Sequence, residues 1–286
     1  MSLAIFHPVT WLLVAQGLCI TACAFYQGLG AHLVLGTLVQ GASLATIYPF
    51  LEGWAKGFVA SRPNLDDSAA VKLAADAWSL VRHTAKTVVI WGLWSPDFDV
   101  LVPWSPPSHL NPAPYTWAQT WVIILYYTCI CDWFCDYYLY TRSCRLAKIR
   151  PKDYNVMLAH HAVTIFLMGG SAFVGYFAIG TSVLYLHEWT DIFISLVKIF
   201  RTTKSPYLVP LFSINLFVWF GTRIVWFVYS LILPAFSVTD SSFLQFMAWN
   251  LVALWAMHLY WFGLMVWLAV SLTRKSSSEV TKMYER

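Results

Sequence analysis

The sequence predicts an all-α polytopic membrane protein with about eight transmembrane helices. Of its 286 residues, 59% are hydrophobic and only 11% are charged, whereas soluble domains carry about 25% charged residues. A soluble chain of this length has no interior large enough to bury so much apolar surface. The 16 tryptophans and 15 tyrosines favour the same fold, because both residue types prefer membrane interfaces.

Eight apolar runs are the candidates for membrane-spanning helices, since about 20 apolar residues cross the hydrocarbon core as a helix. The first two runs are separated only by 28–30 and are predicted as two spans, with one span plus a re-entrant segment as the alternative. The polar stretch 62–67 and the proline-rich segment 103–114 are predicted loops, because proline fixes φ and lacks an N–H. The eight runs cover residues 9–26, 31–50, 74–94, 116–140, 154–172, 174–199, 207–233 and 243–271.

Basic residues near the ends of these runs predict the orientation of the chain. They gather at 142–152, at Arg201 and Lys204, and in the tail after residue 273, which fall on one side of an eight-span chain. We expect that side to be cytosolic, with both termini on it. The six cysteines are predicted to be reduced, since most lie in apolar runs. No basic face with an RNA or DNA motif supports nucleic-acid binding.

Ionisable side chains inside apolar runs mark the candidate site, because they are costly in a membrane and usually face a cavity or one another. Their depths can be compared along the sequence. The runs 154–172 and 174–199 are joined almost directly, so they are predicted to form a helical hairpin that turns near residue 173. The candidates are His160, His161, His187, Glu188, Asp191, Asp132, Asp136, Arg223 and His258.

Helix geometry places several of these candidates at one level. His160 and His187 are equally far from the hairpin turn, about 20 Å at a rise of 1.5 Å per residue. Asp132 lies at a similar level, about 12 Å from the cytosolic end of its run. The spacings i,i+3 and i,i+4 put Glu188 and Asp191 on one helical face with His187. We therefore expect a single polar chamber in the cytosolic half of the membrane.

Such a chamber suits nucleophilic or acid–base chemistry. A neutral imidazole can attack an activated carbonyl or accept a proton near neutral pH, and a neighbouring carboxylate orients it. The alternative is a histidine–carboxylate cluster that only holds helices together. No metal site is predicted, because the eight histidines lack the spacings of membrane di-iron enzymes. A single zinc ion held by His160, His187 and Asp191 is a less favoured alternative.

The hairpin resembles the Lag motif of ceramide synthases, which belong to the TRAM–Lag–CLN8 (TLC) domain superfamily. The family pattern is His-His, two residues and Thr, then Gly-Thr, then Leu-His-Asp, two residues and Asp. Residues 160–167 and 180–191 match it, except that Glu188 replaces the first Asp and keeps a carboxylate. Weaker matches at 72–78, 221–223 and 258–262 extend the resemblance over about residues 70–272.

The resemblance implies a TLC-type barrel of six helices at 70–272, around a cavity open to the cytosol. Residues 1–69 would supply N-terminal spans and a polar linker, and 273–286 a cytosolic tail. The implied activity is ceramide-synthase-like N-acyl transfer in the endoplasmic reticulum membrane, from fatty acyl-CoA to the amine of a long-chain sphingoid base. No cofactor is implied beyond acyl-CoA as co-substrate. Membrane lipids are further partners, and the oligomeric state, a homodimer included, stays open.

Residue roles follow from the same resemblance. His160 is the nucleophile candidate, and His161, Glu188 and Asp191 are candidates for proton handling and orientation. The remaining candidates are supporting or substrate-binding residues, namely His187, Asp132, Asp136, Arg223 and His258. Two other functions remain as alternatives: a non-catalytic TLC protein that binds lipid or assists membrane-protein biogenesis, and a zinc-dependent lipid amidase.

Overall fold

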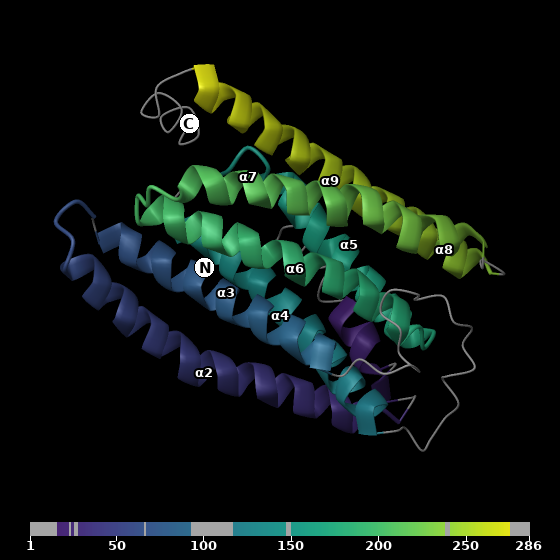
Figure 1. The fold of residues 1–286 in the computed structure, drawn as a ribbon. Coiled ribbons are helices and arrows are strands. Elements are labelled where there is room, and N and C mark those ends of the chain that lie inside the picture. Colours follow the sequence, from purple (N-terminus) through teal and green to yellow (C-terminus); the bar gives the residue numbers. More distant parts are fainter. Residues whose placement is uncertain are drawn as a thin grey trace.

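The computed structural model describes residues 16–22, 24–25, 28–65, 67–92, 117–146, 150–237 and 241–274. The described chain is helical nearly throughout, which confirms the all-α prediction for this part (Figure 1). The predicted proline-rich loop and half of the first predicted span, 9–26, lie outside the described residues. The helices are α2 (Gly30–Ala60), α3 (Asp67–Gly92), α4 (Trp117–Leu146), α5 (Tyr154–Phe173), α6 (Phe177–Thr202), α7 (Leu208–Trp219), η2 (Phe220–Trp226), η3 (Val228–Ile232), α8 (Leu233–Ser237) and α9 (Ser242–Arg274).

Four helices are long and apolar enough to cross a bilayer, and each coincides with a predicted run. They are Gly30–Ala60, Tyr154–Phe173, Leu208–Ser237 and Ser242–Ser271. Their outer surfaces are apolar: Phe50 of α2 exposes 73% of its surface and Phe217 of α7 exposes 79%, as expected of side chains that face lipid. The chain is therefore a multi-pass membrane protein. Helices α3, α4 and α6 cover three more predicted runs, and the total of about eight spans stays a prediction.

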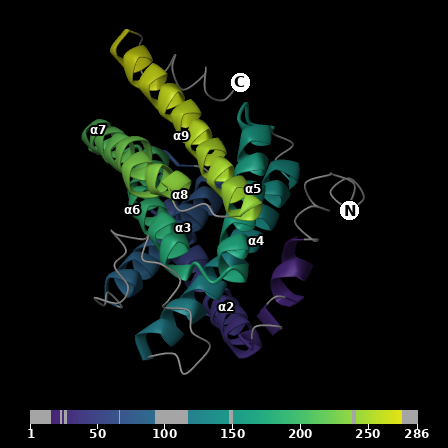
Figure 2. The ribbon, with the colours of Figure 1, turned by 90° about the vertical axis from the view of Figure 1, so that its right-hand side faces the viewer.

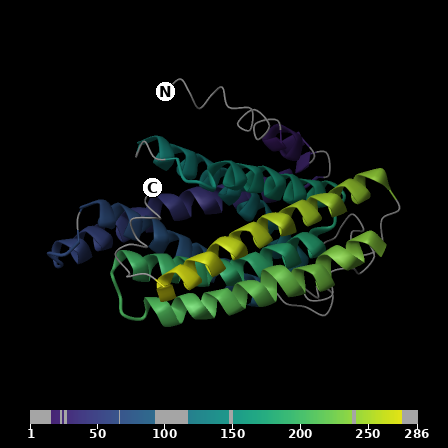
Figure 3. The ribbon, with the colours of Figure 1, turned by 90° about the horizontal axis from the view of Figure 1, so that it is seen from above.

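Helix α6 occupies the middle of the bundle. It packs against α3 and α7 and also contacts α4 and α5. Helices α2 and α9 lie on opposite sides of the bundle (Figures 1 and 2), and the long helices share one general direction (Figure 3). Helix α2 packs against both α3 and α4. The six-helix barrel that the resemblance implies stays a prediction, but α6 is placed to bring its side chains against several neighbours at once.

The predicted hairpin between α5 and α6 is confirmed. Its turn at 174–176 is held by backbone bonds from the Val174 N–H to the Gly170 carbonyl and from the Tyr176 N–H to the Ser171 carbonyl. Gly175 has a φ of 77°, a left-handed conformation that glycine adopts without strain. A connection this short keeps α5 and α6 antiparallel, so equal distances from the turn correspond to equal depth.

The helix that starts at Leu208 widens twice into π-helical turns, η2 and η3, before it ends at Ser237. Such widenings are rare and often accompany functional sites. Here η2 carries Arg223, which is buried with an exposed fraction of only 3%. The widening thus directs a long cationic side chain into the bundle.

Candidate active site

Three histidines from three helices meet inside the bundle: His160 of α5, His187 of α6 and His258 of α9. Each is at least nine-tenths buried. The ring centroid of His160 lies 6.4 Å from that of His187 and 6.4 Å from that of His258. The predicted common depth of His160 and His187 is therefore confirmed.

Hydrogen bonds set the orientation of two of these rings. His187 Nδ1 lies 2.7 Å from the Val183 carbonyl oxygen, and His187 Nε2 lies 2.9 Å from His258 Nε2. A carbonyl oxygen can only accept, so Nδ1 of His187 donates; in neutral rings Nε2 of His187 then accepts from the Nε2–H of His258. His160 Nδ1 is buried and has no partner among the described residues. The same holds for Nδ1 of His161 and of His258.

Aromatic rings enclose the two motif histidines. The His160 ring lies 5.3 Å from Trp133 and 5.2 Å from Trp261, centroid to centroid. His161 lies 5.3 Å from the same Trp133 and also contacts Tyr137 and Tyr140. Aromatic side chains therefore form much of the immediate surroundings of His160.

Asp191 pairs with Arg223. The Arg223 Nη2 atom donates to Asp191 Oδ1 at 2.5 Å and to the His187 carbonyl oxygen at 3.2 Å. The guanidinium also lies 4.3 Å from the centroid of the Trp219 ring. Arg223 thereby ties α6 to η2 beside the histidines, and Asp191 holds Arg223 in that position.

A second polar group, which we call the charge network, joins α2, α3, α4 and α6. Lys86 Nζ lies 2.6 Å from Asp132 Oδ2 and 3.0 Å from Glu188 Oε1. His83 Nδ1 lies 2.5 Å from Glu188 Oε2. Other contacts complete the network: Arg82 pairs with both Asp132 and Asp136, and Gln40 donates to Asp132 at 2.6 Å.

The expectation of one chamber that collects every polar candidate is therefore wrong. His187 and Asp191 face η2 and α9, whereas Glu188 points to α3 and its two carboxylate oxygens contact His83 and Lys86. Asp132 also lies in the charge network. The reason is that the 100° step between consecutive helical residues turns Glu188 away from the face that carries His187 and Asp191.

Three functional candidates were missed by the sequence reasoning: Arg82, His83 and Lys86. All three lie on α3, within the apolar run predicted at 74–94. The rule that ionisable residues in an apolar run face one another would have flagged them. Their partners could not be assigned from the sequence, because Lys86 and Glu188 are separated by 102 residues.

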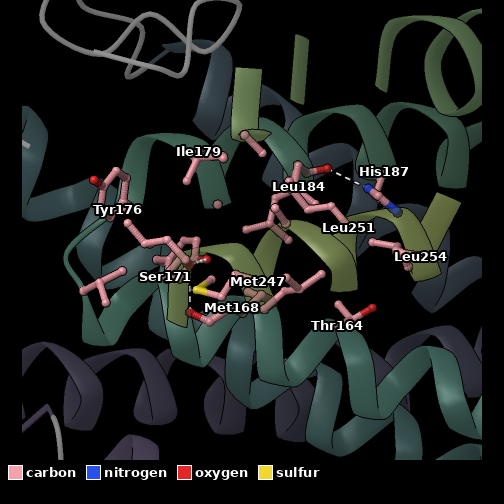
Figure 4. A pocket seen from close by; sticks show the side chains of 18 of the residues that line it. Thr164, Met168, Ser171, Tyr176, Ile179, Leu184, His187, Met247, Leu251 and Leu254 are labelled. Atoms are coloured by element: carbon pink, nitrogen blue, oxygen red, sulfur yellow. Dashed lines mark hydrogen bonds between the residues drawn. The ribbon is translucent and has the colours of Figure 1, made fainter. Parts of the chain in front are cut away.

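An apolar pocket of about 770 Å³ lies beside the histidines. This volume includes space that is open to the surroundings, so the enclosed part of the pocket is smaller. In Figure 4, His187 and Thr164 lie near one end of the pocket and Tyr176, at the hairpin turn, lies near the other. Side chains of α4, α5, α6, α8 and α9 form its walls, among them Tyr126, Trp133, Ser171, Met247 and Leu254. Such a pocket fits a flexible hydrocarbon chain whose reactive end lies near His187.

The sequence profile of the TLC domain matches residues 72–267, more than half of the chain. The chain belongs to the TLC-domain family. Within this TLC domain lie both the histidine group and the charge network, apart from Gln40 of α2.

Several relatives of the chain are named as ceramide synthases. Ceramide synthase LOH2 of Arabidopsis thaliana is 30% identical over 53% of this chain and 54% of its own length. ASC1-like protein 3 of Oryza sativa subsp. japonica is 34% identical over 37% of this chain and 36% of its own length. Ceramide synthase 1 of Mus musculus is 26% identical over 79% of this chain and 68% of its own length. The chain thus spans about half, or less, of the first two relatives.

Within the described ranges, no group of three or more His, Cys, Asp or Glu side chains is arranged to hold a metal ion. Asp191, which the zinc alternative required, is instead 2.5 Å from Arg223. The donor set of that alternative is therefore not assembled.

Proposed function

We propose that this protein is a ceramide-synthase-like N-acyltransferase, which moves a fatty acyl group from acyl-CoA to the amine of a long-chain sphingoid base. The observation that carries the proposal is His160, whose Nδ1 has no partner among the described residues and whose ring packs against Trp133 and His187, two residues that line the apolar pocket. Membership of the TLC-domain family and the similarity to proteins named ceramide synthases support it. By the same reasoning, the protein acts in the endoplasmic reticulum membrane.

In this proposal the pocket binds the acyl chain and His160 reacts with its carbonyl carbon. The acyl chain lies along the apolar walls, which brings the thioester carbonyl to the end near His187 and Thr164. His160 attacks that carbonyl and holds the acyl group as an acyl-imidazole, and the sphingoid amine then displaces it. The aromatic rings around His160 exclude water, which would otherwise hydrolyse this intermediate. The reaction as proposed uses acyl-CoA as co-substrate and no cofactor or metal.

The remaining residues support His160. His187 and His258 keep their rings fixed through their shared hydrogen bond, and the Arg223–Asp191 pair anchors the backbone of His187. Proton handling for the incoming ammonium falls to this pair and to His161. Glu188, Asp132 and Asp136 act in the charge network, where they hold α3, α4 and α6 in register.

The test is expression in cells that lack ceramide synthases, followed by feeding of labelled sphingoid base. The expected product is labelled N-acylated base, absent with the His160→Ala variant expressed at the same level. Lipid binding without labelled product would favour the non-catalytic alternative, and loss of pre-formed ceramide would favour the amidase.

A further inference from the structure

Thr164 has a hydroxyl that is buried but makes no hydrogen bond. The side chain is 5% exposed, and Oγ1 has no partner among the described residues. This is unusual within the protein, because helical threonines normally donate to the carbonyl four residues earlier. That bond is present at Thr87, Thr128, Thr141, Thr181, Thr190 and Thr222. Thr164 also lines the pocket (Figure 4).

Trp133 presents the same anomaly on the neighbouring helix. Its indole Nε1–H is buried and meets no acceptor in the part of the chain that the structure describes, although the ring lines the same pocket and contacts His160. Three other tryptophans use this donor: Trp219 donates to the His258 carbonyl, Trp255 to the Ile224 carbonyl and Trp261 to Asp153. Burying a donor without an acceptor destabilises the folded protein, so two such donors beside one pocket need an explanation.

Helix register places the two donors at the same depth. Tyr126 of α4 is hydrogen-bonded to Ser171 of α5, with 2.5 Å between the oxygens, and the two helices run antiparallel. Seven residues further along α4 is Trp133, and seven residues back along α5 is Thr164, so each is about 10.5 Å from that bond. Thr164 also follows His160 by one helical turn on the same face. Both donors and the nucleophile candidate therefore surround one end of the pocket.

We propose that the Trp133 indole N–H and the Thr164 hydroxyl form the oxyanion site of the acyl transfer. The inference rests on the proposed function and names the groups that stabilise its transition state. Donors that are pre-oriented in a dry site stabilise the developing negative charge more strongly than water does. The acceptor that both donors lack is the carbonyl oxygen of the acyl group.

His160 begins the reaction as a neutral ring. A ring nitrogen lone pair attacks the thioester carbon, and the C=O π pair moves to oxygen, where Trp133 and Thr164 donate to it. Collapse breaks the C–S bond, and the leaving thiolate takes the proton that the acylated ring gives up. The free amine then attacks the same carbon, the oxyanion forms again, and the C–N bond to His160 breaks as the ring regains a proton from the amine. The products are an amide and a thiol.

Thr164 offers a sharp test, because two substitutions separate its hydroxyl from its shape. Thr164→Val keeps the shape and removes the donor, and Thr164→Ser keeps the donor and removes the methyl group. With purified protein, acyl-CoA and sphingoid base, we expect kcat to fall about 100-fold in Thr164→Val. KM for acyl-CoA should stay within about twofold, because the bond forms mainly in the transition state, and Thr164→Ser should keep most of the activity. Thr181→Val, which removes a hydroxyl bonded to the Phe177 carbonyl, is the matched control.

Trp133→Phe tests the second donor, with Trp189→Phe, an exposed ring on α6, as its control. We expect Trp133→Phe to lower kcat by a similar factor. The double variant with Thr164→Val should lower kcat by less than the product of the two single factors, because both donors bind the same oxygen. Full kcat in Thr164→Val, or equal losses in Thr164→Ser and Thr164→Val, would overturn the inference while leaving the N-acyltransferase proposal intact. A parent protein that forms no amide would overturn both.

Discussion

Lys86 of α3 and Glu188 of α6 form a buried ion pair, with 3.0 Å between Nζ and Oε1, although 102 residues separate them. Lys86 also reaches Asp132 of α4 at 2.6 Å. One ammonium group therefore links three helices. The motif carboxylate at position 188 contacts α3, whereas in the proposed mechanism the chemistry falls to the histidines on the other side of α6.

Loss of the buried Lys86 pair should destabilise the protein much more than loss of an exposed ion pair. Lys86→Met leaves two buried carboxylates short of a partner and should lower the free energy of unfolding by about 3–5 kcal/mol. Lys56→Met removes the Lys56–Glu52 pair, whose side chains are 65% and 45% exposed, and should cost less than about 1 kcal/mol. Thermal unfolding midpoints in detergent measure both. Equal midpoints for the two variants would contradict a structural role for Lys86. Adding Glu188→Gln to Lys86→Met should recover part of the lost stability.

His160 should carry the acyl group. Incubation of the parent protein with acyl-CoA alone should add the mass of one acyl chain, removable by hydroxylamine, and His160→Ala should show no adduct. His32→Ala, on α2, controls for the loss of an imidazole elsewhere. Intact-protein mass spectrometry gives the readout. An active parent without any adduct would assign His160 as a general base in direct transfer, and a fully active His160→Ala would remove it from the chemistry.

Gly180 should influence the chain length that the pocket accepts. A Cβ added at Gly180 would overlap the Tyr126 hydroxyl and lie 2.6 Å from the Tyr126 Cζ, so Gly180→Ala must push this ring aside. Both residues line the pocket. We expect a stability loss of about 1–3 kcal/mol from overpacking and a shift of the products toward shorter acyl chains. A mixture of acyl-CoA lengths with mass-spectrometric product analysis tests this, and Gly263→Ala, with open space around its Cβ, should leave the product distribution unchanged.

The basic segment 142–152 should attract acyl-CoA by long-range charge. Arg150 and Lys152 are exposed in the structure, and the competing interpretation is that these charges only set the topology. Reversing both charges to Glu should raise the apparent KM for acyl-CoA about tenfold at low salt, because the CoA phosphates are then repelled. The effect should vanish near 1 M salt, where the Debye length is about 3 Å. An unchanged KM at low salt would leave topology as the role of this segment.

Much of the site could be predicted because helical periodicity depends only on spacing along the sequence, which sets the depth and face of each side chain on its own helix. The direct connection of the two apolar runs was enough to place His160 and His187 at one depth, since antiparallel helices with a three-residue turn leave no freedom of register. The same local reasoning failed for Glu188. Its i,i+3 relation to Asp191 is correct, but the choice between two neighbouring helices depends on how the bundle packs.

Composition and periodicity alone predict a helical membrane protein, the positions of its polar residues along each helix, and the family that its motif resembles. The partners emerge only from the folded bundle: Lys86 with Glu188, Arg223 with Asp191, and His187 with His258. Among the described residues, the donors of Trp133 and Thr164 find no acceptor. The physical reason is that a buried charge must find an opposite charge, but which residue answers it depends on helix rotation and neighbour choice, and these are set by the packing of the whole bundle.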